Sequence, residues 1–226
     1  HGMEGSDSPL LIIPGGTENL LANELGFDEN LDTLIRTFEE GIIKPFDLGR
    51  INGKYFTCIT GFGFDGQVIK GINEARTGNI DHLDYFWPLW DTFWTYRFQP
   101  MQVKADGRQI FDGEGLVFVG NISRYAVGLE LLRYADYSDG LLDICIYKCS
   151  SKLRLIKHSL LTLLKCHIHR SDVIYRRAAE IDITSDKFIS SQVDGDPGPL
   201  LPAEIRVVPG AVNMMIPAGT RPGGIR

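Results

Sequence analysis

Apolar residues recur along the first 40 positions at spacings typical of a buried strand and then of helices. A continuous apolar run at residues 9–14 predicts a strand buried on both faces of a parallel sheet. A glycine-rich loop follows, and residues 20–25 are expected to form a short helix that ends at Gly26. A second, amphipathic helix is predicted over residues 31–40. Its apolar positions are Leu31, Leu34, Ile35 and Phe38. This order of strand, loop, helix and helix is a piece of α/β architecture.

From residue 42 onward the pattern changes to the alternation of antiparallel strands. Asn-Gly at 52–53 and Asp-Gly at 106–107 each stand between two strand-like runs and predict two-residue hairpins. Further strands are expected at 116–120, 141–147, 180–184, 188–193 and 204–208. Helices are expected near 84–98 and 152–169. The chain therefore divides into the end of an α/β domain, residues 1–45, and a β-sandwich or open barrel with inserted helices, residues 46–226, whose last residues return to the first domain.

Composition narrows the class of protein. The 226 residues are 43% hydrophobic and 23% charged, as in a soluble globular protein, and the net charge of -6 argues against a nucleic-acid partner. The four cysteines show no CxxC pair, which favours reduced thiols in the cytoplasm. No apolar run approaches the roughly 18–20 residues that a membrane span requires, and no stretch has the pattern of a signal peptide.

Two glycine-rich stretches are candidates for binding. Residues 15–19, GGTEN, lie between a strand and a helix, where free N–H groups and a hydroxyl suit a phosphate. Because glycine-rich turns between strands and helices are common, a purely structural loop is the alternative. Residues 61–66, GFGFDG, permit close approach of the backbone, and here the alternative is a β-bulge or a barrel corner.

Two acidic stretches are candidates for chemistry. Residues 136–143, DYSDGLLD, place carboxylates three apart in a tight turn, and such oxygen donors can hold Mg²⁺. The alternative is a turn before a strand. Residues 192–199, QVDGDPGP, bring Asp194 and Asp196 together around a glycine. One acid could act as a general base with the other orienting it, or both could be the polar corner of a hairpin.

Two predicted helices are candidates for contact with lipid. Residues 84–98 hold all three tryptophans, and this aromatic density suits an acyl-chain pocket or a membrane interface, with a helix packed on the sheet as the alternative. Residues 152–170 are amphipathic, with five basic residues and no acid. That segment could contact anionic lipid, or it could be a solvated face of a packed helix.

Taken in order, four stretches resemble the bacterial diacylglycerol-kinase-like lipid kinases, relatives of the sphingosine and ceramide kinases. They are LLIIPGGTENLLANELG at 10–26, GFGFDGQVI at 61–69, VGNISRYAVGLELLRYADYSDGLLDICI at 119–146 and VDGDPGPLLPAEIRVVPGAVNMMIP at 193–217. The resemblance implies an α+β fold: a remnant of an α/β nucleotide-binding domain followed by a β-sandwich lipid-kinase domain. It implies transfer of the γ-phosphoryl group of ATP to a lipid hydroxyl, with Mg²⁺.

The same resemblance assigns roles to individual positions. The residue that it assigns to the nucleotide is Thr17, and Gly15, Gly16 and Asn19 of the same loop, together with Asp65, are further candidates for binding the nucleotide. The residues that it assigns to Mg²⁺ are Asp136, Asp139 and, through its carbonyl, Leu141. Asp196 falls at the proton acceptor and Asp194 at the acid beside it.

The departures from the family pattern qualify these expectations. The family usually has Glu at the position of Asp196, and the Asp that commonly follows the loop asparagine is Leu20 here. The family's Gly-Gly-Asp-Gly-Thr nucleotide motif does not occur in these residues, so we expect the isolated chain, a carboxy-terminal portion, to bind ATP weakly and to be inactive.

The expected partners are a diacylglycerol-like lipid of phospholipid biosynthesis, ATP and the surface of a membrane that a cytoplasmic protein contacts peripherally. A homodimer is one option for the assembly. The alternatives for function are a sphingoid-base or ceramide kinase and a non-catalytic lipid-binding module.

Overall fold

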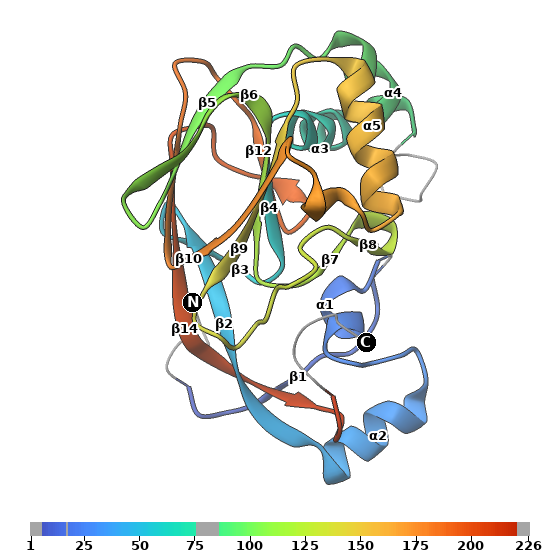
Figure 1. Cartoon of the computed structure of the whole chain (residues 1–226). Coiled ribbons are helices and arrows are strands. Elements are labelled where there is room, and N and C mark those ends of the chain that lie inside the picture. The colour runs from blue at the N-terminus through green and yellow to red at the C-terminus, as the bar shows by residue number, and fades with distance from the viewer. Residues whose placement is uncertain (1–5, 17, 76–85, 221–226) are drawn as a thin grey trace.

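The computed structural model describes residues 6–16, 18–75 and 86–220 as short helices around a curled set of strands (Figure 1). In chain order the elements are β1 (Leu10–Leu11), α1 (Leu20–Glu24), α2 (Leu31–Glu40), β2 (Ile42–Ile51), β3 (Lys54–Phe56), β4 (Ile59–Phe62), α3 (Phe64–Ala75), α4 (Phe86–Thr95), β5 (Pro100–Ala105), β6 (Arg108–Gly120), β7 (Arg124–Tyr125), η2 (Ala126–Gly128), β8 (Leu129–Glu130), β9 (Leu142–Lys148), α5 (Lys152–Leu163), η3 (His167–His169), β10 (Val173–Ala178), β11 (Glu180–Thr184), β12 (Ser191–Val193), β13 (Asp196–Pro197) and β14 (Ala203–Ile216).

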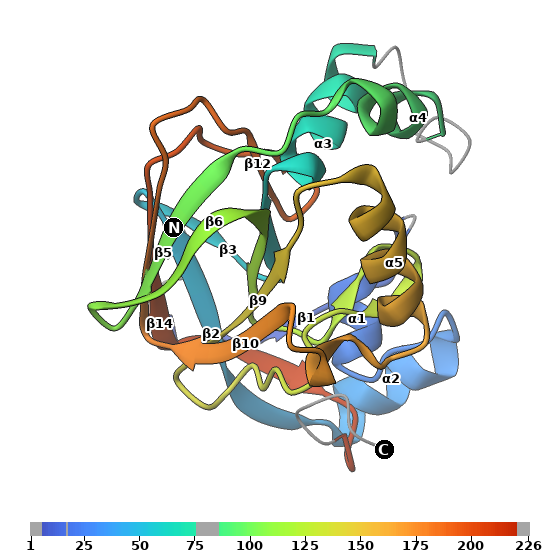
Figure 2. The ribbon, with the colours of Figure 1, turned by 45° about the horizontal axis from the view of Figure 1, so that its top comes forward.

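The larger strands form two sheets that share β6. The first half of β6 pairs with β5, and that sheet continues through β11, β14, β2 and β3. The second half of β6 pairs with β4 and β9, and that sheet continues through β12 and β13 on one side and β10 on the other. Because one strand of 13 residues belongs to both sheets, they fold over each other into a β-sandwich (Figure 2).

Alternating side chains of β6 and β9 divide the core into two clusters. Leu142, Ile144 and Ile146 point into the cluster between the two sheets. Cys145 and Tyr147 point to the opposite face, into a cluster that the helices and the amino-terminal segment cover. This alternation follows from the two-residue period of a strand. Each fully buried aliphatic side chain contributes about 1.5–3 kcal/mol to folding, so the second sheet is stabilised on both faces.

The amino-terminal portion is a small α/β unit attached to the end of the long strands. β1 pairs in parallel with β14, Leu10 opposite Met214, so the parallel pairing is as predicted. The predicted strand at 9–14 is wrong in length and burial: it has two residues, both half-buried, and Ile13 is exposed. Its one neighbour in the described sheet is β14, so the burial on both faces expected of a central parallel strand does not arise. The domain boundary after residue 45 stays a prediction.

Helix α2 has the predicted bounds but an unexpected environment. Its N-cap Asn30 accepts a hydrogen bond from the amide of Asp32, and the helix is followed by Gly41. Of its four apolar positions, Leu34 packs partly against the core, whereas Leu31, Ile35 and Phe38 are 48–71% exposed. The apolar periodicity therefore identified the helix correctly, but the described residues cover only part of its apolar face.

Most predicted turns and strands are present, and one helix was not predicted. Both Asn52-Gly53 and Asp106-Gly107 adopt positive φ at the centre of hairpins, as predicted. The chain from Phe64 to Ala75 forms α3, where the sequence pattern predicted no helix. The strand expected at 188–193 spans only Ser191–Val193, and the helix expected at 152–169 ends at Leu163 before a short 3-10 turn.

Candidate active site

The hairpin at residues 192–197 contains the two aspartates predicted as acid and base. β12 and β13 pair antiparallel, with Val193 opposite Asp196. Asp194 and Gly195 form the turn between them, with φ of 51° and 88°. Positive φ at both central residues is what such a two-residue turn requires, and Asp and Gly tolerate it. The predicted Asp-Gly turn is therefore confirmed.

The carboxylate of Asp194 is held by the segment that enters β4. Its Oδ2 accepts hydrogen bonds from the amide and the hydroxyl of Thr57, at 2.7 and 2.8 Å. Its Oδ1 accepts from the amides of Cys58 and Ile59, at 2.8 and 2.9 Å. Asp194 is exposed, and donors of the chain occupy both of its carboxylate oxygens, so this side chain fixes the hairpin against β4 and its role beside the base stays a prediction.

Asp196 lies two residues later, as the first residue of β13, and its side chain is exposed. Both acids of the hairpin are therefore exposed, and the four hydrogen bonds fix the carboxylate of Asp194 in place. The proton-accepting role of Asp196 stays a prediction, and this arrangement is compatible with it.

A buried polar network lies behind the hairpin. Asp65, in the first turn of α3, is buried, and its Oδ1 accepts a hydrogen bond from the hydroxyl of Tyr125. Burial raises the pKa of Asp65 to about 6, and the hydrogen bond from Tyr125 opposes that rise. Gln192 is also buried, and its Oε1 accepts a hydrogen bond from the amide of Gly195 at 2.9 Å. Gln192 thus holds the turn that precedes Asp196, whereas its Nε2 and Oδ2 of Asp65 are both buried without a hydrogen-bond partner among the described residues.

The glycines at 61–66 make this network possible. A Cβ atom at Gly61 would lie 2.1 Å from Oδ2 of Asp65, so only glycine leaves room for the carboxyl. Gly63, with φ of 98°, turns the chain from β4 into α3. The stretch is therefore a strand-to-helix turn, and the bulge or barrel corner weighed from sequence is wrong. The described contacts of Asp65 are within the protein, and its contact with a nucleotide stays a prediction.

The glycine-rich loop before α1 satisfies two of its own amides. Gly15 and Gly16 both donate to Oδ1 of Asn19, at 3.0 and 2.7 Å, and Asn19 itself lies at a φ of 48°. The expectation that this loop offers free N–H groups to a phosphate is wrong for these two amides, because the short Asn side chain folds back over them. Thr17 lies outside the described residues.

The loop predicted to bind Mg²⁺ is held by an aspartate that the sequence analysis did not single out. Asp47 in β2 is buried, and its two carboxylate oxygens accept hydrogen bonds from the amides of Gly210 and Gly140, each at 2.7 Å. Burial raises the pKa of Asp47, these two hydrogen bonds oppose the rise, and the charges of Asp139 and Asp136 add to it. Negative charge is therefore concentrated at this loop.

The two acids of the loop each bond to the chain. Oδ1 of Asp136 accepts from the amide and hydroxyl of Ser138, at 3.0 and 2.8 Å. Oδ1 of Asp139 accepts from the amide of Leu141 at 3.0 Å, and its Oδ2 accepts from Arg177 at 2.9 Å. Among the described residues, no three His, Cys, Asp or Glu side chains are grouped to hold a metal ion. The donor chemistry still fits Mg²⁺, since carboxylates and a carbonyl are hard oxygen ligands.

A second buried acid that was not predicted joins α1 to the loop after β6. Glu24 accepts a hydrogen bond from the hydroxyl of Ser123 at 2.8 Å and lies 3.6 Å from Nε of Arg124. Burial raises the pKa of Glu24, and the hydrogen bonds of Ser123 oppose the rise. Glu24 and Asp47 were missed because each is a lone acid in an apolar stretch. The available signal was an acid at a position where the pattern predicts burial, which needs partners from elsewhere.

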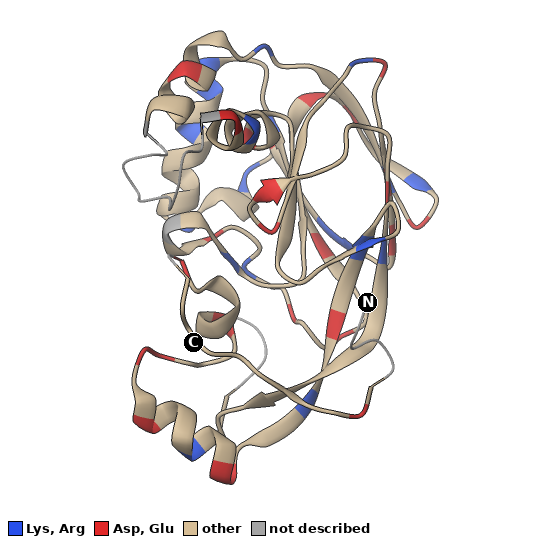
Figure 3. Ribbon diagram, turned by 180° about the vertical axis from the view of Figure 1, so that it is seen from behind, with Lys and Arg blue, Asp and Glu red and all other residues tan. Residues whose placement is uncertain are grey.

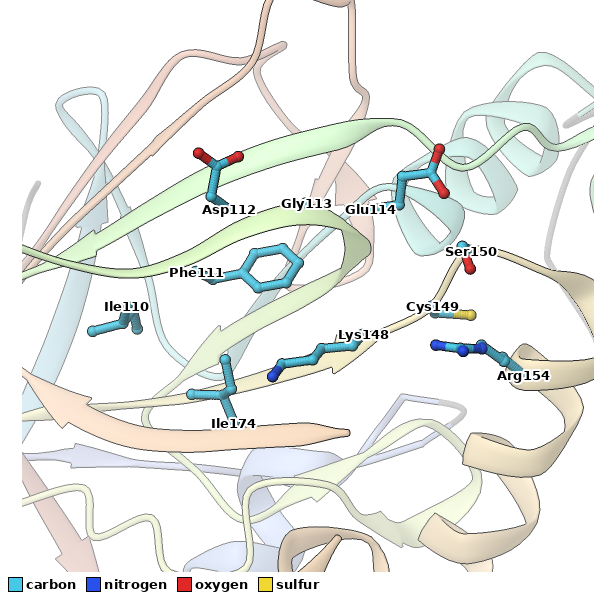
Figure 4. A pocket seen from close by; sticks show the side chains of 10 residues that line it. All are labelled: Ile110, Phe111, Asp112, Gly113, Glu114, Lys148, Cys149, Ser150, Arg154 and Ile174. Atoms are coloured by element: carbon cyan, nitrogen blue, oxygen red, sulfur yellow. The ribbon is translucent and has the colours of Figure 1, made fainter. Parts of the chain in front are cut away.

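Two cavities of the structure lie away from the candidate site residues described above. One of about 410 Å³ lies where β6 bends toward β9 and α5, and both Lys148 and Arg154 line it opposite Asp112 and Glu114 (Figure 4). Another of about 340 Å³ lies between α3, the end of α4 and the loop before β12. None of the described candidate residues lines either cavity. Residues 194–197 of the hairpin are exposed to solvent.

The sequence of this chain matches a known domain family and several proteins named as kinases. Residues 58–216 match the family described as the YegS C-terminal NAD kinase beta sandwich-like domain. A protein named diacylglycerol kinase from Mycobacterium tuberculosis is 32% identical over 222 residues, which are 95% of this chain and 71% of that protein. A protein of the same name from Bacillus subtilis is 26% identical over 85% of this chain and 64% of its own length.

Solved structures from Bacillus anthracis share the fold. A crystal structure of a diacylglycerol kinase superposes with a TM-score of 0.66 at 21% identity, over 94% of this chain and 68% of that one. A second structure from the same organism superposes with a TM-score of 0.74 at 24% identity, over 94% of this chain and 70% of that one. The chain therefore belongs to the bacterial diacylglycerol-kinase-like lipid kinase family, of which it carries the carboxy-terminal portion.

Proposed function

We propose that this chain carries the lipid-binding and proton-accepting part of a kinase that transfers the γ-phosphoryl group of ATP to the hydroxyl of a diacylglycerol-like lipid. The observation that carries the proposal is the hairpin, in which four hydrogen bonds anchor Asp194 while Asp196 is exposed two residues later. The names of the relatives, diacylglycerol kinase, support the reaction class and the kind of lipid.

In this proposal Asp196 accepts the proton of the lipid hydroxyl. As the hydroxyl oxygen bonds to the γ-phosphorus, its proton passes to a carboxylate oxygen of Asp196, and the bond from the γ-phosphorus to the bridging oxygen breaks to release ADP. A positioned base of this kind contributes about 10²–10⁴-fold to the rate. Asp194 and Gln192 position that base, because their hydrogen bonds fix both sides of the turn.

Mg²⁺ would be held by Asp136, Asp139 and the carbonyl of Leu141, with water as the remaining ligands. Bound there, it would neutralise the negative charge that gathers beside Asp47. The contribution of this chain is to hold the loop: the amide of Gly140 donates to Asp47, and Arg177 restrains Asp139.

The nucleotide would meet the loop at Gly15, Gly16, Thr17 and Asn19, with Asp65 as a fifth candidate. Binding of a phosphate by the two glycine amides requires that the side-chain Oδ1 of Asn19 release them.

Phosphate transfer from radiolabelled ATP across a panel of lipids tests this function. The panel holds diacylglycerol, a monoacylglycerol, sphingosine and ceramide, and the assay is run on this chain and on the longest product that its gene encodes. We expect Mg²⁺-dependent labelling of diacylglycerol by the latter. Preferential labelling of sphingosine or ceramide favours the related kinases, and no labelling of any lipid by either protein leaves a lipid-binding module.

A further inference from the structure

Helix α5 turns most of its large aliphatic side chains away from the protein. Its buried side chains are Leu155, His158 and Thr162. Five large aliphatic side chains of the helix and its end are between 45% and 80% exposed: Leu153, Ile156, Leu160, Leu163 and Leu164. The sequence pattern correctly placed apolar residues on one side of this helix, but an amphipathic helix on a globular core normally buries that side.

The polar side of α5 is held inward by specific contacts. The hydroxyls of Thr162 and Tyr147 lie 2.7 Å apart, and Nε2 of His158 lies 3.3 Å from the carbonyl of Lys148. The rings of Tyr147 and His158 pack at 5.0 Å between centroids. Rotating the helix to bury its leucines would break these buried hydrogen bonds, which are costly to leave unmade. The exposure of the leucines is therefore a fixed property of the fold.

Helix α4 extends this apolar surface with aromatic side chains. Trp87, Trp90 and Trp94 lie at i, i+3 and i+7, on one side of the helix, and are 50–71% exposed. Lys152, the first residue of α5, donates to the carbonyl of Trp94 and lies 5.0 Å from the centroid of that ring. This contact joins the end of α4 to the start of α5, and both helices lie toward the same end of the molecule (Figures 1 and 2). We call the exposed apolar residues of the two helices the α4–α5 face.

The α5 side of this face is basic in a chain whose net charge is -6, whereas α4 carries one exposed acid, Asp91. Residues 144–171, which include α5, contain Lys148, Lys152, Arg154, Lys157, Lys165 and Arg170 and no Asp or Glu. Two of these cations are paired, Lys157 with Asp172 and Lys165 with Glu130. Arg154 and Arg170 are exposed. Figure 3 shows lysine and arginine on the helices at this end of the protein.

We propose that the α4–α5 face is a docking surface for an anionic lipid bilayer. The inference rests on the proposed function, because a lipid kinase must reach a substrate that resides in a membrane. Interfacial helices combine leucine and tryptophan on one side with basic residues around them, and tryptophan is enriched at the boundary between headgroups and acyl chains.

The same features argue against a second copy of this chain as the occupant. A two-fold contact would set the acid-free segment of one copy against that of the other, and such like-charge contact is unfavourable. Within the described residues no helix is long and apolar enough to cross a membrane. The bilayer contact we propose is therefore interfacial, with both helices lying on the surface.

Intrinsic fluorescence tests this directly, because the three tryptophans of the chain all lie on α4. The protein is titrated with vesicles of phosphatidylcholine and phosphatidylglycerol that contain no diacylglycerol, without ATP. We expect a blue shift of the emission, quenching by brominated lipids and co-sedimentation with the vesicles. Vesicles of pure phosphatidylcholine, or added salt, should weaken the binding.

The variant is Leu160→Gln with Leu163→Gln, which changes two exposed residues of α5. We expect about 10-fold weaker partitioning, since each leucine contributes apolar area to the contact. The matched control is Leu31→Gln with Phe38→Gln on α2, which removes exposed apolar side chains from another helix and should leave partitioning unchanged. Unchanged melting temperatures show that both variants are folded.

Three results would overturn the proposal: no binding by the unmodified chain, equal loss in both double variants, or a change in oligomeric state on gel filtration with no change in vesicle binding. Because the vesicles hold neither substrate, failure of the kinase assay leaves this measurement standing. Conversely, phosphorylation of a short-chain diacylglycerol in solution, together with no vesicle binding, would refute the docking surface alone.

Discussion

Asp194 and Asp196 are chemically identical and two residues apart, but the structure assigns them different effects when their charge is removed. The comparison uses Asp194→Asn and Asp196→Asn. Asparagine is the appropriate replacement at residue 194, because it tolerates the φ of 51° there, whereas alanine would add backbone strain. Each variant therefore changes only the carboxylate.

The expected cost at Asp194 follows from its four hydrogen bonds. The amide of asparagine keeps one acceptor oxygen, which can still serve the amides of Cys58 and Ile59, but its NH₂ group replaces the oxygen that accepts from Thr57. Hydrogen bonds to a charged group are worth about 1.5–3 kcal/mol. Water can reach the exposed donors of Thr57 and recovers part of that, so we expect a loss of about 1–2 kcal/mol in unfolding free energy.

The exposed side chain of Asp196 predicts a loss below about 0.5 kcal/mol for Asp196→Asn. Urea unfolding of the two variants and the unmodified chain at pH 7 measures these values. Thermal melts should agree, at about 2–4 °C per kcal/mol for a chain of this size. Equal destabilisation by both substitutions, or none at Asp194, would refute the division of roles.

Three further predictions concern other parts of the fold. Gly66→Ala should lower the free energy of unfolding by about 1–3 kcal/mol, because the added Cβ would lie 2.3 Å from the carbonyl oxygen of Ser190. Gly71→Ala in the same helix should raise it by up to about 1 kcal/mol, because its Cβ would lie 3.6 Å from the nearest atom. Equal unfolding midpoints for the two variants would contradict this difference. Folding raises the pKa of Asp65 from 3.8 to about 6, so the folded state binds this proton more tightly than the unfolded state does. The resulting stabilisation is complete below pH 3.8 and is lost as the pH rises through 6. Asparagine does not titrate, so the unfolding free energy of Asp65→Asn relative to that of the unmodified chain should increase by about 3 kcal/mol from pH 3.5 to pH 7.5. If urea unfolding gives the same difference between the two proteins at both pH values, the pKa of Asp65 is not raised. A thiol reagent should label Cys166 alone in the native protein and all four cysteines in denaturant, because the other three are buried; two or more labelled thiols before unfolding would be inconsistent with the structure.

Local signals in the sequence were sufficient for turns and for isolated helices. Asn-Gly and Asp-Gly pairs predicted three hairpin turns, since few residues tolerate positive φ twice in succession. The helix Leu31–Glu40 was predicted to the residue from its period and its terminal glycine. Helix α3 was not, because its two internal glycines argue for a loop, and only the close approach of Gly66 to β12 explains why one of them is needed.

The orientation of α5 and the partners in the site depend on tertiary contacts. The apolar stripe of α5 was predicted, but its outward orientation depends on Tyr147, a residue of another element. The clamp on Asp194 comes from residues 57–59, more than 130 positions earlier, and the anchor of the candidate magnesium loop is Asp47. A local sequence pattern does not predict contacts between residues so far apart in the chain. The family resemblance identified the candidate acids, and the structure shows the hydrogen bonds that hold them.

The role of Asp196 as the base of a lipid kinase is measured by the rate of phosphoryl transfer from ATP to diacylglycerol in the longest product of the gene. The rate is compared among Asp196→Asn, Asp196→Glu and the matched surface variant Asp186→Asn. We expect a loss of about 10²–10⁴-fold for Asp196→Asn, activity retained in Asp196→Glu and no change in Asp186→Asn. Transfer at the unmodified rate in Asp196→Asn would contradict it.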